Sequence, residues 1–313
     1  MTNLSEFTFL SSDGKTQLHG MLWEPEGVAV RAVLQICHGV AEHIARYDGF
    51  ARALNEQGIV VAGHDHLGHG KSLPEGGTPV YFGQGNTWNT VVDDIYVLHQ
   101  RLKQRYPDVP LCIMGHSMGS FLTRTYLIRY PGTVKAAVIM GTGWQPRAAI
   151  TGGLALANAI AAVSGENATS ELVTELAFGS YNKLFAPNRT KVDWLSADES
   201  NVDDYIADPL CGADATVGLF RQMLHGIRFN QRQSHLRQMD REMPVLFVAG
   251  DKDPVGNCGK GVRQTYDAFR AAGMRDCTLK LYPGLRHEIL NEKAYTADIT
   301  KNIEAWLLSR LEK

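Results

Sequence analysis

The sequence predicts an α/β fold with a mostly parallel sheet, and two features of the chain carry this prediction. Short apolar runs alternate with longer amphipathic segments through the first half, and the alternation resumes near the C-terminus. Strands that are buried on both faces read as nearly continuous apolar runs, and their alternation with helices is typical of parallel sheets. The expected parallel strands are Val33–Cys37, Ile59–Ala62, Leu111–Met114, Val134–Met140, Val245–Ala249 and Thr278–Leu281.

The segments between these runs have the length and pattern of helices. The expected helices are Arg46–Glu56, Thr87–Arg105, Met118–Arg129 and Gly261–Ala272. From Tyr295 to Leu311 apolar residues recur at i, i+4 and i+8, which predicts a closing helix packed on a core. Two earlier stretches, Glu6–Leu10 and Leu18–Trp23, read as an antiparallel hairpin that we expect at the edge of the sheet.

The alternation of strands and helices stops between about Gly143 and Asp240. This region is helical and aromatic in character, and it contains one clear amphipathic helix pattern formed by Leu219, Phe220, Met223, Leu224 and Ile227. We therefore expect a core domain of residues 1–142 and 241–313, with residues 143–240 inserted between two core strands as a helical cap.

Composition and charge exclude several classes of protein. The 31 Lys plus Arg against 33 Asp plus Glu give a net charge of −2, which argues against a nucleic-acid partner. The start of the chain does not read as a signal peptide, and Ala148–Val163 is short for a membrane span and interrupted by polar residues. The five cysteines form no C-x-x-C pair, so we expect a reducing, cytoplasmic location.

The segment Gly115–Gly119 reads Gly-His-Ser-Met-Gly, and it joins an expected strand to an expected helix. This is the G-x-S-x-G pattern in the strand–turn–helix context that marks a nucleophilic serine. Such a turn strains the backbone at Ser117, and a Cβ at either glycine would press on neighbouring elements. The hydroxyl is expected beside a helix N-terminus, which favours developing negative charge. The alternative is an ordinary turn flanked by glycines.

A nucleophilic serine needs a base, and the base needs an orienting acid. Asp251 and Asp253 follow the expected strand Val245–Ala249, and His287 lies in the loop after the last expected strand. Loops at the carboxyl ends of parallel strands meet at the edge where Ser117 is expected, and the order Ser, Asp, His is the order of this motif's triad. Both aspartates are candidates for the acid, and Asp253, before a proline, is preferred.

Five segments together make the chain similar to the α/β-hydrolase superfamily, and within it to the branch of monoacylglycerol lipases, lysophospholipases and serine aminopeptidase-like hydrolases. These segments are residues 38–47, 65–72, 115–119, 250–253 and 287–292. Asp193–Ser196 and Asp208–Cys211 also resemble the cap of bacterial proteins often called lysophospholipases. The resemblance covers nearly the whole chain and implies an α/β-hydrolase fold, an inserted helical cap and a role in lipid metabolism.

The resemblance also implies a role for each site residue. The triad would be Ser117 as nucleophile, His287 as base and Asp253 as the orienting acid. The backbone N–H groups of Val40 and Met118 would form the oxyanion hole, since an oxyanion needs two converging donors. The family usually carries a small residue and a glycine after His-Gly, whereas this chain has Val40 and Ala41. This bulkier loop would narrow the entrance for an acyl chain.

The loop after Gly39 offers candidates for substrate binding. Glu42 and Arg46, with His43, would line the polar side of the pocket and hold a glycerol or another headgroup. The alternative is an ion pair between Glu42 and Arg46 that only braces the loop. The Ala148–Val163 helix and the aromatic residues of the cap are expected to bind the acyl chain, unless the cap helices merely pack on one another.

Two further motifs point to metal or phosphate, and both fail on spacing. His64, His66 and His69 lack the second Asp-His pair of a dinuclear metallohydrolase. Gly68–Ser72 resembles the end of a phosphate loop, but Asp65 stands where that pattern needs glycine. We therefore expect neither a metal nor an organic cofactor.

The sequence thus predicts a serine hydrolase of carboxylic esters, of monoacylglycerol or lysophospholipid type, that forms an acyl-enzyme on Ser117. Its expected partners are an acyl-lipid ester and, through the cap, a membrane surface, while its oligomeric state is not predicted. One alternative is a serine aminopeptidase similar to proline iminopeptidases. It would need acidic cap residues facing Ser117, for which the candidates are Glu171, Glu175, Asp203 and Asp204. The other alternative is a non-catalytic ligand-binding protein of the same fold.

Overall fold

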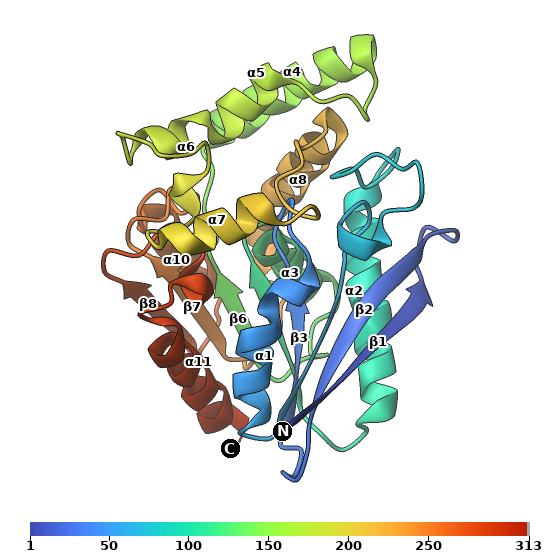
Figure 1. Cartoon of the computed structure of the whole chain (residues 1–313), viewed down its shortest axis with the longest axis vertical. Helices are drawn as coiled ribbons and strands as arrows, with labels where there is room; N and C mark the ends of the chain where they lie inside the picture. Colours follow the sequence, from blue (N-terminus) through green and yellow to red (C-terminus); the bar gives the residue numbers. More distant parts are fainter. Residues whose placement is uncertain (312–313) are drawn as a thin grey trace.

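The computed structural model describes residues 1–311, leaving aside the side chains of residues 176 and 177. These residues form one eight-stranded sheet with helices on both of its faces (Figure 1). The strands are β1 (Thr2–Leu10), β2 (Gln17–Pro25), β3 (Ala32–Cys37), β4 (Ile59–His64), β5 (Leu111–His116), β6 (Ala137–Met140), β7 (Val245–Gly250) and β8 (Cys277–Tyr282).

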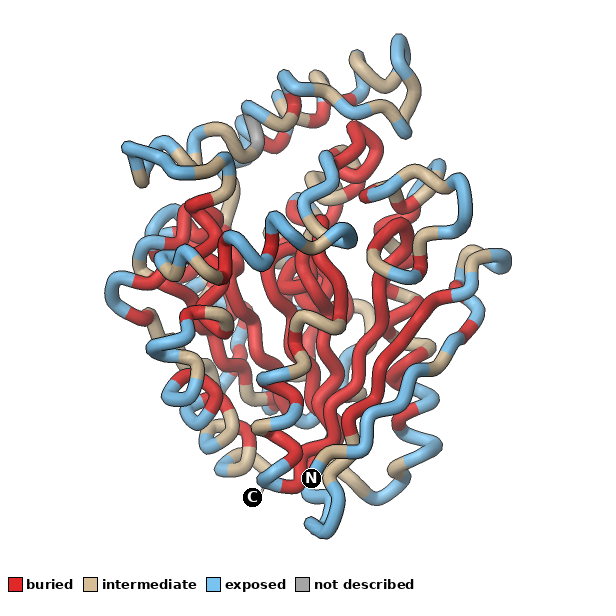
Figure 2. The backbone as a smooth tube through the Cα atoms, in the orientation of Figure 1, coloured by how far each residue is buried: buried red, intermediate tan, exposed pale blue. Residues whose placement is uncertain are grey.

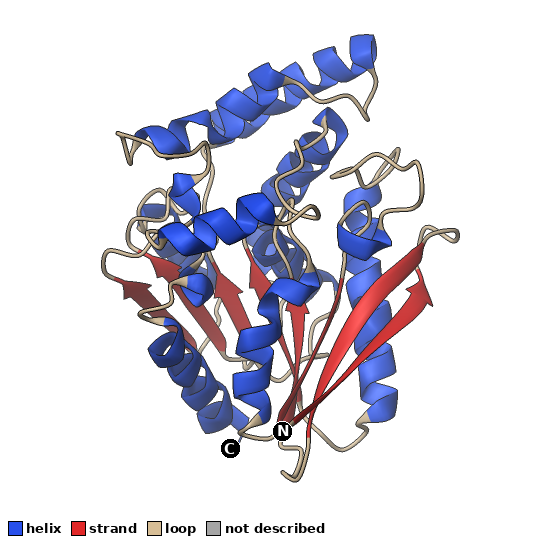
Figure 3. Cartoon of the chain, viewed as in Figure 1, coloured by secondary structure: helices blue, strands red, loops and turns tan. Residues whose placement is uncertain are grey.

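The strand order is β1-β2-β4-β3-β5-β6-β7-β8. Strand β1 pairs antiparallel with β2, and β2 pairs antiparallel with β4, whereas β3 to β8 run parallel. The predicted α/β class, the mostly parallel sheet and the hairpin at its edge are therefore confirmed. All six parallel strands point their carboxyl ends to the same edge, where Figure 3 shows loops and short helices above the strand tips.

Helices cover the two faces of the sheet unequally. The helices packed on the sheet are α1 (Asp48–Asn55), α2 (Thr87–Arg105), α3 (Met118–Arg129), α10 (Lys260–Ala271) and α11 (Thr296–Leu311). One apolar cluster joins the sheet to α2, α3 and α10, and a second joins its other face to α1 and α11. Successive residues of a strand point to opposite faces, so Val33 enters the first cluster and Leu34 the second.

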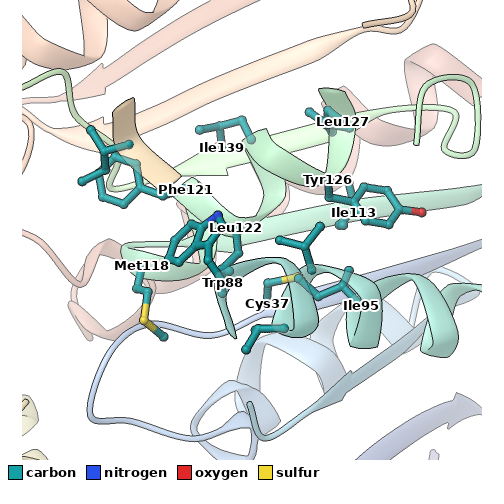
Figure 4. Packing of buried hydrophobic residues seen from close by; sticks show 14 of the residues in the cluster. Cys37, Trp88, Ile95, Ile113, Met118, Phe121, Leu122, Tyr126, Leu127 and Ile139 are labelled. Atoms are coloured by element: carbon teal, nitrogen blue, oxygen red, sulfur yellow. The ribbon is translucent and has the colours of Figure 1, made fainter. Parts of the chain in front are cut away.

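The first cluster supports the turn that carries Ser117. Figure 4 shows Trp88 of α2 among Met118, Phe121 and Leu122 of α3, with Cys37 of β3 close by. The Trp88 indole N–H also donates to Thr125 Oγ1 at 3.0 Å, so the ring is fixed by a hydrogen bond as well as by packing. The first turns of α3 are therefore held rigidly against the core.

Several element boundaries differ from the sequence prediction, and two of the differences have a clear structural cause. The expected helix Arg46–Glu56 is divided into a 3-10 turn, η1 (Ile44–Tyr47), and α1, because Asp65 Oδ1 accepts the Ile44 N–H at 2.8 Å and pins the start of the turn. The strand expected from Val134 begins at Ala137, since Lys135 is exposed and residues 137–140 are the ones that pair with both β5 and β7.

The chain between β6 and β7 is mainly helical and lies over the carboxyl ends of the strands (Figure 1). Its elements are α4 (Arg147–Ser164), α5 (Glu171–Thr174), the π-helical turn η3 (Glu175–Gly179), α6 (Ser180–Lys183), the 3-10 turn η4 (Asp193–Leu195), α7 (Glu199–Ala207), α8 (Val217–Asn230) and α9 (Gln233–Leu236). We call residues 143–240 the cap. Its treatment as a separate inserted unit stays a prediction, because α8 packs on both α3 and α2 of the core.

Helix α4 is the most exposed part of the cap. It rests on α8, and Figure 2 shows it as mainly exposed and half-buried. Its 18 residues have a mean hydropathy of 1.3 and only 17% of them are buried, so length and composition alone would allow it to cross a membrane. One such helix is weak evidence for a membrane span, since core helices of soluble proteins and signal sequences can have the same length and hydropathy.

Candidate active site

Ser117 occupies a sharp turn between β5 and α3. Its φ and ψ are 54° and −122°, in a region that non-glycine residues rarely adopt and that stores strain. A Cβ on Gly119 would collide with the backbone carbonyls of Cys37 and His38, and one on Gly115 would collide with the Gly119 carbonyl and Thr123. Both glycines are therefore required by close backbone approach, which explains the spacing of the motif.

His287 and Asp253 come from two other loops at the same edge of the sheet. The His287 Nδ1 lies 3.0 Å from Asp253 Oδ1, and both side chains are buried. Asp253 Oδ1 also accepts the Val255 N–H at 2.9 Å, which fixes the carboxylate. When Nδ1 donates to a carboxylate, Nε2 is left as a proton acceptor, the state that a general base needs.

Asp251 has a different role in the structure from Asp253. Its Oδ1 accepts the Gly284 N–H at 2.8 Å and so joins the loop after β7 to the loop after β8. The structure therefore brings Asp253, and not Asp251, to His287. Of the two aspartates that the sequence left open, the geometry supports Asp253 as the orienting acid.

The loop that would supply the oxyanion hole lies against Ser117. A Cβ placed on Gly39 would lie 2.6 Å from Glu42 Oε1 and 3.1 Å from the Ser117 Cβ, so a larger residue here would displace the Glu42 carboxylate. Ala41 in the same loop has a positive φ of 52°. Its carbonyl accepts hydrogen bonds from Tyr205 Oη and from the Gly212 N–H, each at 3.0 Å. Two groups of the cap thus hold this loop in its strained conformation.

The two amides assigned to the oxyanion hole have unused donors. Over residues 1–311, neither the Val40 N–H nor the Met118 N–H donates a hydrogen bond to another residue. Met118 begins α3, whose first N–H groups carry the positive end of the helix dipole. Both donors are therefore available to an anion, and their role in an oxyanion hole stays a prediction.

Glu42 forms the centre of a buried ionic network beside the triad residues. Its Oε1 accepts the Gly39 N–H at 2.5 Å and lies 3.2 Å from His116 Nδ1, and its Oε2 accepts from Arg46 Nη1 at 2.9 Å. Arg46 in turn donates to both carboxylate oxygens of Glu288, each at 2.8 Å. The network therefore connects the oxyanion loop, the residue before Ser117 and the residue after His287.

The charges of this network hold one another in the ionised state. Burial alone would raise the pKa of Glu42, but the hydrogen bond to His116 and the charge of Arg46 lower that pKa well below its usual value. Burial opposes the protonation of His116, yet the Glu42 carboxylate raises its pKa above the usual value. A protonated His116 then donates from Nε2 to the His287 carbonyl at 3.3 Å.

The predicted substrate-binding role of Glu42 and Arg46 remains untested. The ion pair that the sequence offered as the alternative is present, with Glu42 buried and the Arg46 side chain 10% exposed. Contact with a substrate headgroup therefore stays a prediction, while the bracing of the loop is a structural fact.

Aromatic residues of the cap cover the base, and sequence reasoning missed this contact. The ring centroid of Trp194 lies 5.1 Å from the ring centroid of His287. The ring centroid of His116 lies 4.7 Å from that of His287. Trp194 also packs against Phe178 at 6.1 Å and Tyr181 at 5.2 Å. The sequence marked these residues as cap aromatics but held no signal that the Trp194 ring lies against the ring of His287.

The three histidines considered as metal ligands form a buried cluster together with His38. His38, His64, His66 and His69 are buried with ring centroids 4.2–5.4 Å apart. Both ring nitrogens of His64 and of His66 lack a hydrogen-bond partner among the described residues. His38 Nδ1 donates to the Gly39 carbonyl at 2.8 Å while its Nε2 accepts the His66 N–H at 2.9 Å. These bonds require neutral His38 and fix the start of the oxyanion loop.

A different group has the donor set of a metal site. Among the residues that the structure describes, His43, Asp208 and Cys211 have ligand atoms within 4.8 Å of one another. His43 Nε2 lies 2.8 Å from Asp208 Oδ2, so a hydrogen bond between the loop and the cap explains this pair without an ion. The expectation of no metal stays a prediction.

Comparison with known proteins places the chain among ester hydrolases. The family model for serine aminopeptidases of type S33 matches residues 28–294. A monoacylglycerol lipase of Mycolicibacterium smegmatis is 30% identical, with 98% of each chain covered. A monoglyceride lipase of Mus musculus is 28% identical, over 96% of this chain and 90% of its own. In solved structures, a carboxyl esterase of Bacillus coagulans with bound glycerol has 26% identity and a TM-score of 0.92, covering 99% of this chain and 100% of its own.

The histidine cluster predicts a loss of stability in acid. Burial lowers the pKa of His64 and His69 to about 3 each, and it lowers the pKa of His38 and His66 as well. Between the unfolded-state pKa of about 6.5 and the lower folded-state values, these histidines bind protons only in the unfolded chain. The free energy of unfolding therefore decreases as the pH is lowered through this range. His19 and His116, whose pKa values are raised by carboxylates, act in the opposite direction but are fewer.

Replacing one imidazole tests this explanation. Urea unfolding of His64→Leu should show a loss of free energy between pH 7 and pH 5 that is smaller than in the wild type by about 2 kcal/mol. A variant that loses as much free energy as the wild type over this range would show that the buried histidines do not cause the acid sensitivity.

Proposed function

Since the chain belongs to the serine aminopeptidase S33 family and is a carboxylic ester hydrolase of the α/β-hydrolase fold, we propose that it cleaves monoacylglycerol- or lysophospholipid-type esters through an acyl-enzyme on Ser117. The observation that carries the proposal is the hydrogen bond between His287 Nδ1 and Asp253 Oδ1 at the edge of the sheet where the Ser117 turn lies. This arrangement provides a nucleophile, a base and an orienting acid from three separate loops.

The proposed reaction has two steps. Ser117 Oγ attacks the acyl carbonyl carbon while its proton passes to His287 Nε2, and the ester C–O bond then breaks as the leaving alcohol takes that proton. Water next attacks the acyl-enzyme with His287 again as base, which releases the acid and restores the Ser117 hydroxyl. The Val40 and Met118 N–H groups would stabilise the oxyanion in both steps.

Two observations support an acyl lipid as substrate. Relatives that match this chain over nearly their whole length are named as monoacylglycerol or monoglyceride lipases. The cap places an apolar aromatic surface at the base, with Trp194 on His287 and Phe178 packed against both Trp194 and Phe220. Such an apolar surface suits the alkyl chain of an acyl group. The glycerol group of a monoacylglycerol is neutral, so its binding needs no charged side chain.

Access to the site requires the cap to move. Ser117 is 8% exposed and His287 is 2% exposed, so the structure is closed around the reacting groups. We propose that the cap also makes peripheral contact with a membrane when it admits a lipid, since α4 is apolar and mostly exposed. A cytoplasmic location stays a prediction from the cysteine content.

The aminopeptidase alternative has less support from the cap. The four acidic candidates for binding a free amino group are Glu171, Glu175, Asp203 and Asp204, and all four are exposed. Three of them lie within ion-pair distance of surface cations, which are Lys183, Arg189 and Lys293. The proposal therefore keeps an ester as the substrate.

Turnover of graded substrates tests the proposed function. We expect the wild type to cleave p-nitrophenyl esters, 1-monoacylglycerols and a lysophospholipid, with an optimum chain length that reports the depth of the acyl site. Ser117→Ala should keep the thermal unfolding midpoint and lose nearly all turnover, about 10⁶-fold, because the nucleophile is gone. Turnover of aminoacyl p-nitroanilides in preference to esters would contradict the proposal, as would undiminished activity of Ser117→Ala.

The two aspartates offer a matched pair of variants. Asp253→Asn should lower kcat on the order of 10⁴-fold, because an amide favours the wrong tautomer of His287. Asp251→Asn removes the carboxylate charge but keeps an oxygen that can accept the Gly284 N–H, so it should lower kcat less than about tenfold. Steady-state kinetics on one ester checks both, and a larger loss for Asp251→Asn would reverse the assignment.

A further inference from the structure

A groove outside the active site lies between the N-terminus of α2 and one face of α8, with α4 above (Figure 1). Its volume is about 510 Å³, within the range of small-molecule sites. No residue assigned above to the triad, the oxyanion hole or the Glu42 network lines it. The groove is therefore a separate feature that the proposed ester hydrolysis does not use.

The groove is lined by positive charge. Arg221, His225 and Arg228 lie at i, i+4 and i+7 of α8, and Arg232 continues the same face just beyond its end. No carboxylate lines the groove within the described part of the chain. Arg221 pairs with Glu166 at 2.5 Å, whereas the exposed Arg228 contacts His225 and forms no ion pair with a described carboxylate.

The N-terminus of α2 adds to this charge. Helix α2 has 19 residues, and Asn86 at its N-cap, which lines the groove, makes no side-chain hydrogen bond to the first turn. The Trp88 N–H reaches Gln222 Oε1 only at 3.4 Å. A long helix presents partial positive charge and free N–H donors at this end. Two independent elements, the arginine face of α8 and the α2 terminus, therefore converge on one cavity.

The pKa of His225 reflects the positive charge around the groove. Its pKa lies below the usual value, first because it is partly buried and then because of the charges of Arg228 and Arg221. Arg228 Nη2 lies 3.1 Å from His225 Nδ1, an arrangement in which a neutral imidazole accepts from the guanidinium. A bound anion would compensate this positive charge.

We propose that the groove binds the phosphate group of a phosphorylated molecule, held by Arg228, Arg232 and the N-terminus of α2. Guanidinium groups match phosphate oxygens in a forked geometry and stay charged at every physiological pH. A helix N-terminus provides a second set of donors for the same group. The volume of the groove leaves room for an organic part beyond the phosphate.

Calorimetric titration of the full chain tests the proposal. Inorganic phosphate, pyrophosphate and glycerol 3-phosphate are the probes, at constant ionic strength with chloride as the reference anion. We expect saturable binding of at least one probe and a rise in the NMR-detected pKa of His225 on binding. The Arg228→Gln/Arg232→Gln double variant should bind about 100-fold or more weakly, since it loses at least two charge-assisted hydrogen bonds to the phosphate.

Two further variants control for net charge and for folding. Asn86→Asp keeps a residue type that is favoured at helix N-caps but places a carboxylate in the groove, so it should also weaken binding. Arg237→Gln removes an exposed cation outside the groove and should bind as the wild type does. Equal binding by the double variant and the wild type, an equal loss in Arg237→Gln, or no saturable binding into the millimolar range would each overturn the proposal.

Vesicles distinguish the two sources of the phosphate group. If a lipid headgroup is the natural ligand, vesicles with phosphatidic acid should bind the wild type more tightly than the double variant, and glycerol 3-phosphate should compete. If the ligand is a soluble phosphate ester, the two proteins should bind these vesicles equally while the soluble probes still discriminate between them. Both results support the phosphate site and assign its source.

Discussion

The carboxylate of Glu42 is the interaction on which the candidate site depends. It holds the Gly39 N–H of the oxyanion loop, lies against His116 next to the nucleophile, and reaches the base loop through Arg46 and Glu288. The four charges alternate in sign and are buried together. Separating any partner from such a network would leave a buried charge without compensation, which costs free energy. The network therefore holds the three loops in fixed positions relative to one another.

The cap is part of this arrangement as well as a cover. Tyr205 and Gly212 hold the strained Ala41 carbonyl, and Trp194 lies on the ring of His287. Movement of the cap that admits a substrate would therefore loosen the contacts that order the oxyanion loop. The closed structure and the chemistry are coupled, because the same cap residues exclude water and position reacting groups.

Local sequence was enough to predict the parallel sheet, the hairpin and the turn at Ser117, since each depends on a short pattern at or near the end of a strand. It also placed His287 in a loop at the same edge of the sheet, while the catalytic role of this residue stays a prediction. It favoured Asp253 over Asp251 only through the proline that follows Asp253, because two residues in one loop differ mainly in where the turn directs their side chains. The Glu42–Arg46 pair was readable at i, i+4, but its partner Glu288 lies 242 residues from Arg46. The spacing of the α8 arginines was equally visible, yet it gains meaning only beside the N-terminus of α2.

The kinetics of Glu42→Gln test the central role of this carboxylate most directly. The amide keeps the shape of the side chain but loses the charge that holds Arg46 and His116, so the oxyanion loop should lose its register with Ser117. We predict that kcat for one ester falls by about 100-fold while KM changes little, since misplacement of the reacting groups by about 1 Å costs this much. An unchanged kcat in a folded Glu42→Gln protein would contradict the account.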